Sequence, residues 1–280
     1  MEQMVASAGE YCGNPNWLRL GGDLTAATVS ALLVSPSVTI IDRALVEKAS
    51  YHKPLLQSLR SHTRAALSHP RSFLFSRPHG HVFTLYAATY TVANGTETVT
   101  RQTHPAISDA LTFVLTFLVN VPLGVRKDIR FAQLFGTSSQ IDPAKKPLPI
   151  PKKTGSSAAT ATLLVRDAIT IYGSFTLAQR CADVIPDSLA THPYSKTVFT
   201  QMVVPVMSQL AATPLHLLGL DLYNRQYRVP WRDRAAVVWR DLPSATVIRC
   251  ARIIPAFGLG CLANMGLRSY FHQSVDNEMK

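Results

Sequence analysis

The sequence predicts an all-α membrane protein with six transmembrane helices arranged as three two-helix repeats. Three observations lead to this fold class: long runs without charged residues, basic charge confined to alternate loops, and a proline pattern that recurs three times. The composition agrees, because 47% of the 280 residues are hydrophobic and only 16% are charged, whereas a soluble domain carries about 25% charged residues. We therefore expect a single membrane domain over residues 1–280.

Four of the six predicted spans are uncharged runs of 16 to 24 residues, at 24–41, 78–96, 110–125 and 197–220. Two weaker spans are expected at 161–179 and 253–267. Arg166 and Asp167 interrupt the first of these, and Arg249 and Arg252 precede the second. A spanning helix needs about 20 largely apolar residues, so each weak stretch is alternatively a buried soluble helix.

The basic charge supports six spans, because it gathers on one side of such a bundle. The three loops 42–80, 126–165 and 221–251 hold 20 of the 28 Lys and Arg residues and only seven acidic ones. The opposite side holds six basic and nine acidic residues. This asymmetry is the positive-inside rule, and it accounts for the net charge of +11. We therefore expect the lipid bilayer as a partner and no nucleic acid.

Three segments of the chain resemble one another. In each, an apolar run is followed by a proline (Pro36, Pro122 or Pro214) and then by an aspartate (Asp42, Asp128 or Asp221). The repeats cover approximately residues 17–100, 101–190 and 191–280. Because a proline inside a helix bends it, we expect kinks near the three prolines.

The loops of the repeats differ from one another. Residues 55–67 are amphipathic at helical spacing, and 231–240 are similar, so both are expected either along a membrane surface or as solvated connectors. Residues 136–160 are rich in Pro, Lys and Ser, which is typical of a flexible linker.

This layout resembles the mitochondrial carrier family. Pro36, Pro122 and Pro214 match the proline of the family's signature Pro-x-[Asp/Glu]-x-x-[Lys/Arg], and Lys127 is the other position that matches it. Arg252 and Pro255 fit the family's Arg-x-x-Pro element. The resemblance implies a multi-pass protein of a mitochondrial membrane, the inner one or, for divergent members, the outer one. It also implies a carrier-like transporter or, alternatively, a carrier-derived scaffold or insertion factor that moves no solute.

Charges inside predicted spans indicate a binding site, since they usually face an interior cavity or a partner. Arg252 and Arg166 are the candidates for binding a small anionic solute, because the planar guanidinium suits carboxylate or phosphate. The structural alternative is that Arg166 and Asp167 neutralise partners on neighbouring helices and that Arg249 and Arg252 both extend to the basic side. Asn120 and Asn264 are further candidates, and their alternative role is hydrogen bonding between helices.

The sequence contains no pattern for catalysis, metal binding or a cofactor. No nucleophile elbow or phosphate-binding glycine loop occurs, and the four cysteines show no CxxC spacing. We therefore predict no enzyme activity, no metal and no cofactor. The oligomeric state is not assigned.

Overall fold

The computed structural model describes residues 15–51, 53–135, 157–177, 181, 193–225 and 229–278. Every regular element within these ranges is helical, and none of these residues forms a β-strand. The all-α prediction is therefore confirmed. Most of the predicted linker 136–160 lies outside the described residues, and its last four residues form the first turn of helix α7.

Eight helical rods make up the described chain, and two of them contain a π-helical segment. Their bounds are α2 Pro15–Tyr51, α3 Leu55–Ser68, α4 Pro70–Leu74, α5 Arg77–Thr103, α6 Pro105–Phe135, α7 Ser157–Ile171 with η2 Tyr172–Leu177, α9 Pro193–Asn224, and α10 Trp231–Ile253 with η4 Ile254–Cys261 and α11 Leu262–Glu278.

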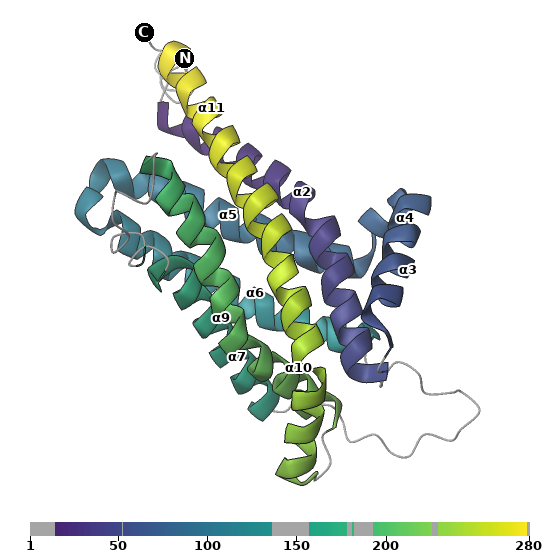
Figure 1. Ribbon diagram of the computed structural model, residues 1–280. Helices are drawn as coiled ribbons and strands as arrows, with labels where there is room; N and C mark the ends of the chain where they lie inside the picture. The colour runs from purple at the N-terminus through teal and green to yellow at the C-terminus, as the bar shows by residue number, and fades with distance from the viewer. Residues whose placement is uncertain are drawn as a thin grey trace, which may run out of the picture.

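Six of these rods form a closed ring. Helix α2 packs on α5, α5 on α6, α6 on α7, α7 on α9 and α9 on α10, and α11 returns to α2. Figure 1 shows the yellow α11 running beside the purple α2. The short helices α3 and α4 lie outside the ring, where they contact α2 and α5. The ring order brings side chains from distant parts of the sequence to a common interior.

The ring closes through tight packing at Gly260 in η4. A Cβ atom at this position would lie 2.4 Å from Tyr90 Oη and 2.5 Å from Val34 Cγ2. Small residues let helices approach closely in this way, so the absence of a side chain at Gly260 allows the last rod to reach α2 and α5.

The three predicted prolines all lie inside helices: Pro36 in α2, Pro122 in α6 and Pro214 in α9. Each proline removes one backbone N–H and crowds the preceding turn, so a helix bends most readily there. The kinks at these positions remain a prediction.

Four helices in the described part are long and apolar enough to cross a membrane, at Asn16–Tyr51, Pro105–Phe135, Val203–Asn224 and Trp231–Glu278. Helices α5 and α7, which contain most of the predicted spans 78–96 and 161–179, are not among them. The arrangement of six spans in three repeats is therefore not confirmed. The physical reason is that both helices turn polar side chains, including Asn94 and Arg166, into the ring.

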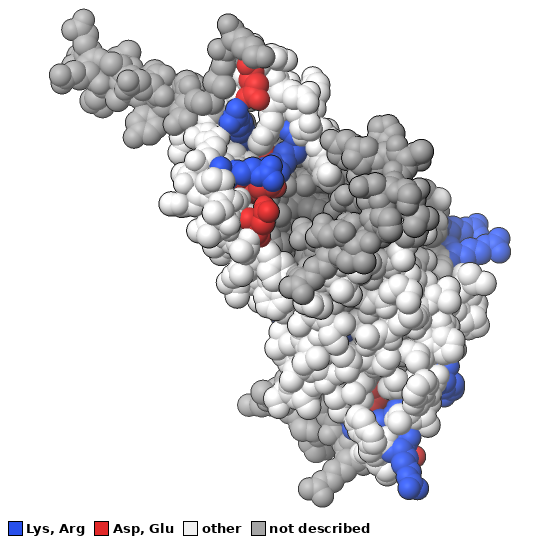
Figure 2. Space-filling view, turned by 60° about the vertical axis from the view of Figure 1, so that its left-hand side comes forward, with Lys and Arg blue, Asp and Glu red and all other residues white. Residues whose placement is uncertain are grey.

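The outside of the ring is apolar. Leu118, Met207 and Leu262 are 59%, 57% and 54% exposed. Figure 2 shows one face on which an area without charged side chains lies between charged groups at the upper left and charged groups at the lower right. Exposed apolar surface of this kind marks an interaction site, and on helices long enough to span a bilayer that partner is lipid. The chain is therefore a multi-pass membrane protein.

Helix α3 confirms the amphipathic helix predicted at 55–67, and it exposes Leu56 and Leu67. The predicted helix 231–240 is not separate, because α10 continues to Ile253. Trp231 and Trp239 on α10 are exposed, and tryptophan is enriched where a membrane meets water.

One buried histidine lies between α3 and α2. His62 Nε2 lies 3.0 Å from Glu47 Oε1 of α2. Burial and the nearby Arg43 guanidinium hold the pKa of His62 below its usual range, although the Glu47 carboxylate acts in the opposite direction.

Candidate functional site

A cavity of about 170 Å³ lies inside the ring. Five rods line it, from α5, α6, α7, α9 and the α10–η4 rod. Its wall combines apolar side chains with neutral polar and charged ones. The charged lining residues are Lys127, Asp128, Arg166, Asp167, Arg249 and Arg252.

Two buried aspartates organise these charges, and each lies six residues after a helix proline, in α2 and α6. Lys127 Nζ contacts Asp42 and lies 2.8 Å from Asp128 Oδ1. Arg166 Nη2 contacts Asp128 Oδ2, and Arg252 Nη1 lies 3.1 Å from Asp42 Oδ1. These five residues form the central ion-pair network, in which both oxygens of each aspartate have a cationic partner.

Asp167 and Arg249 differ from this network because each keeps one polar atom without a partner. Asp167 Oδ1 lies 3.1 Å from Arg166 Nη2, whereas Oδ2 has no hydrogen-bond partner among the described residues. Arg249 donates from Nε and Nη2 to Gln209 Oε1 over 3.1 and 2.9 Å. Its Nη1 is likewise buried without a partner in the described part of the chain.

Neutral polar groups complete the cavity wall. Asn120 Nδ2 donates to Thr89 Oγ1 over 2.9 Å, which joins α6 to α5. Tyr90 Oη donates to the Ala256 carbonyl over 3.4 Å. Thr170 also lines the cavity. The cavity therefore offers amide and hydroxyl groups beside its charges.

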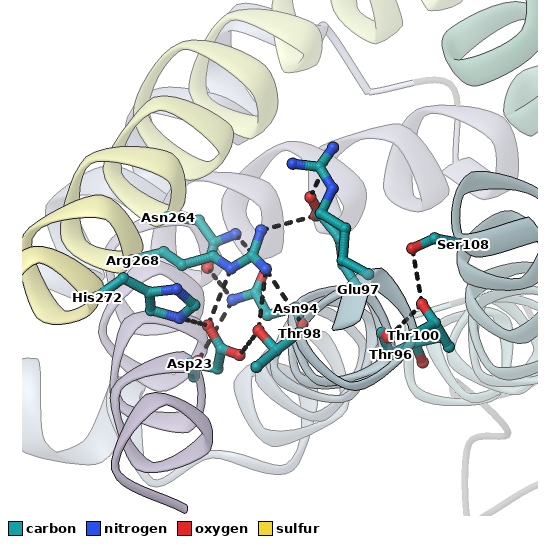
Figure 3. A network of polar contacts seen from close by, with 11 residues as sticks. Asp23, Asn94, Thr96, Glu97, Thr98, Thr100, Ser108, Asn264, Arg268 and His272 are labelled. Carbon is teal, nitrogen blue, oxygen red and sulfur yellow. Dashed lines mark hydrogen bonds and ion pairs between the residues drawn. The ribbon is translucent and has the colours of Figure 1, made fainter. Parts of the chain in front are cut away.

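A second polar cluster joins α2, α5 and α11 at the end of the ring where α2 begins. Its members, drawn in Figure 3, are Asp23, Asn94, Glu97, Thr98, Asn264, Arg268 and His272, and we refer to them as the end cluster. Asp23 Oδ1 lies 2.9 Å from Arg268 Nε and 2.8 Å from His272 Nε2. Asn94 and Asn264 exchange two hydrogen bonds of 2.9 Å.

The structure brings three of the four predicted binding residues to the cavity. Arg252, Arg166 and Asn120 line it, but all three already have partners within the protein. The acidic partner of Arg252 is Asp42 of α2. Asn264 lies in the end cluster and forms the interhelical hydrogen bonds of its alternative role.

The residues with free hydrogen-bonding capacity were not selected from the sequence. Arg249 was visible as a charge before the sixth predicted span, and Asp167 as a charge in the fourth. Their unpartnered atoms depend on contacts that no spacing reveals. Gln209 gave no signal, because it is one neutral residue in the uncharged run 197–220.

No group of three His, Cys, Asp or Glu residues in the described ranges is placed to hold a metal ion.

A family profile identifies the chain. The profile of the family described as probable citrulline exporters matches residues 26–272. No curated protein matches the chain. The resemblance to mitochondrial carriers is therefore wrong, and the mitochondrial location that followed from it is no longer supported. Prolines in spans and basic loops occur in helical membrane bundles generally, and Lys127 alone fitted the rest of the carrier signature. Because the match covers most of the sequence, the chain belongs to the probable citrulline exporter family.

Proposed function

We propose that this protein exports a small polar solute through its central cavity, and that citrulline is the first solute to test. The observation that carries this proposal is a buried cavity within a membrane bundle whose wall holds charged side chains of both signs. The family description supports a transporter rather than an enzyme, and it names citrulline.

The size of the cavity favours a small metabolite. Sites for drug-sized ligands occupy about 300–1,000 Å³, whereas this cavity measures about 170 Å³. A nucleotide is a poor fit to such a space. Citrulline, with an α-amino acid group and an uncharged ureido side chain, is among the smaller metabolites.

The charge of the cavity favours a solute that carries a carboxylate. Arg249 is 4% exposed and contacts a neutral glutamine rather than an acidic residue. The predicted small anionic solute would meet this requirement, and so would citrulline, which carries a carboxylate although its net charge is zero. We place the solute at this arginine.

The cavity also bears on the alternative of a membrane scaffold that moves no solute. A scaffold needs no open charged groups in its interior, because unpaired charge at membrane depth is costly. Arg249 Nη1 and Asp167 Oδ2 are open polar atoms of this kind. They favour a transporter.

Export is tested with purified protein in liposomes preloaded with radiolabelled citrulline. We expect efflux above that of protein-free liposomes, competition by unlabelled citrulline, and little competition by nucleotides or dicarboxylates. Arg71→Gln, which changes an exposed arginine of α4, serves as the charge-matched control and should transport normally. Efflux equal to that of protein-free liposomes, with the protein intact in the membrane, would refute citrulline export and favour the scaffold.

A further inference from the structure

We infer that the cavity binds an α-amino acid through the two charged groups of the amino acid, each held by a different residue. Asp167 Oδ2 accepts a hydrogen bond from the α-ammonium, and Arg249 Nη1 donates one to the α-carboxylate. This inference rests on the proposed function and extends it from a cavity to a headgroup site of two named residues. It also predicts which amino acids the site rejects.

The first argument is that the other charges of the cavity are already paired. Asp42 and Asp128 each contact two cationic side chains, one at each carboxylate oxygen. Lys127 and Arg166 each contact two aspartates. A solute gains little by competing with these contacts, because the buried partner would be left without compensation.

The second argument concerns Arg249. Among the basic side chains that line the cavity, Arg249 alone has no carboxylate partner among the described residues. Gln209 occupies Nε and Nη2 and so fixes the guanidinium in place, while Nη1 remains available. A guanidinium that is held on one side and open on the other is suited to a carboxylate ligand, whose oxygens accept such hydrogen bonds.

The third argument concerns the space beside Asp167. A Cβ atom at residue 124 would lie 3.2 Å from Asp167 Oδ2, but residue 124 is a glycine. Gly124 itself lines the cavity. The unpartnered carboxylate oxygen therefore lies against a position where α6 carries no side chain.

The fourth argument is the relation between the two residues. Asp167 of α7 and Arg249 of α10 line the same cavity, yet their open atoms share no hydrogen bond. An α-amino acid carries its ammonium and carboxylate on one carbon, so a single headgroup placed between the two residues satisfies both.

The remaining lining sets the selectivity for the side chain. Asn120, Tyr90 and Thr170 offer amide and hydroxyl groups, and no second open carboxylate lines the described cavity. A neutral ureido group can form hydrogen bonds there. A guanidinium or ammonium side chain finds no acidic partner, so arginine and ornithine should bind more weakly than citrulline.

The test measures equilibrium binding of radiolabelled L-citrulline to the purified full chain, with three unlabelled competitors. These are L-citrulline, 5-ureidopentanoate, which lacks the ammonium, and N-(4-aminobutyl)urea, which lacks the carboxylate. Loss of one buried charged partner weakens binding by on the order of 100-fold, so we expect each analogue to bind the wild-type protein about 100-fold more weakly than citrulline.

Two variants that each remove one charge then assign the groups. Asp167→Asn should weaken citrulline by about 100-fold and leave 5-ureidopentanoate almost unchanged, since that analogue has no ammonium to lose. Arg249→Gln should weaken citrulline similarly and leave N-(4-aminobutyl)urea almost unchanged. Asp109→Asn and Arg71→Gln, which change exposed residues, are the matched controls and should bind as the wild-type protein does.

A third variant tests the site without removing a charge. Gly124→Ala adds a methyl group 3.2 Å from Asp167 Oδ2, and it should weaken citrulline more than 5-ureidopentanoate. If the wild-type protein binds all three ligands alike, the headgroup assignment is overturned while the proposed export stands. If the wild-type protein binds no citrulline, both are overturned. The wild-type comparison decides these outcomes even where a variant fails to fold.

Discussion

Arg252 and Arg249 lie three residues apart in α10. The structure predicts that replacing Arg252 mainly lowers stability, whereas replacing Arg249 mainly abolishes solute binding. Arg252→Met keeps much of the apolar stem of the side chain but removes one of the two cationic partners of Asp42. Breaking a buried ion pair costs about 3–5 kcal/mol. Asp42 keeps Lys127, and the Arg252 side chain is 19% exposed, so we expect the lower end, about 3 kcal/mol of unfolding free energy.

Arg249→Met should behave differently. It leaves the neutral Gln209 amide without a donor, which costs about 1 kcal/mol, and it also removes a buried charge that no carboxylate of the described residues compensates. The two effects oppose each other. We therefore expect a change in unfolding free energy below about 1 kcal/mol together with loss of citrulline binding.

The assay is a double-mutant cycle of Arg252→Met and Asp42→Asn, with unfolding followed in mixed micelles. If the two residues form one pair, the double variant should be more stable than the sum of the single effects implies, by about 1–3 kcal/mol. Additivity within about 0.5 kcal/mol would refute the pairing. A loss of stability in Arg249→Met as large as that in Arg252→Met would refute the division of roles.

Three further predictions concern packing, protonation and the end cluster. Gly260→Ala places its Cβ 2.4 Å from Tyr90 Oη and should lower the free energy of unfolding by about 1–3 kcal/mol. Gly266→Ala, whose new Cβ has no heavy atom within 4 Å, should raise it by up to about 1 kcal/mol. Thermal unfolding of the two variants checks this difference. Because the folded state lowers the pKa of His62, its stabilising contribution is present above about pH 6.5 and is lost as the pH falls through the folded pKa. The amide protection factors of α3, which are corrected for the intrinsic pH dependence of exchange, should therefore fall in acid, and an equal fall in His62→Gln would contradict this cause. Asp23→Asn leaves Arg268 with Glu97 as its one carboxylate partner in the described chain. We therefore expect faster amide exchange in α11. Unchanged exchange would show that the end cluster does not hold α11 to α2.

Hydropathy and charge predict the helical class, because they are properties of short windows. The uncharged runs around Pro36, Pro122 and Pro214 are long helices in the structure. The same windows fail for α5, since Asn94 and Thr98 lower its hydropathy although both are buried in the ring. A window measures polarity but cannot tell which side of a helix faces lipid.

The candidate site could be predicted only in part. Charges within apolar segments identify Arg166, Asp167, Arg249 and Arg252 as unusual, and all four line the cavity. Their partners could not be predicted, because the contacts join residues far apart in the chain, as Lys127 and Asp42 are, at a separation of 85 residues. Which arginine is paired and which is open depends on those contacts. The sequence favoured Arg252 over Arg249 because Arg252 fits the Arg-x-x-Pro element, which carries no information about its partner.

The opposite signs of Asp167 and Arg249 also have an electrical consequence. An α-amino acid bound between them adds one positive and one negative charge, so the complex carries the same net charge as the unliganded protein. Moving one elementary charge across 100 mV takes about 2.3 kcal/mol, and a zwitterion that crosses as a unit avoids this work. The voltage across the membrane then exerts no net pull on the solute itself.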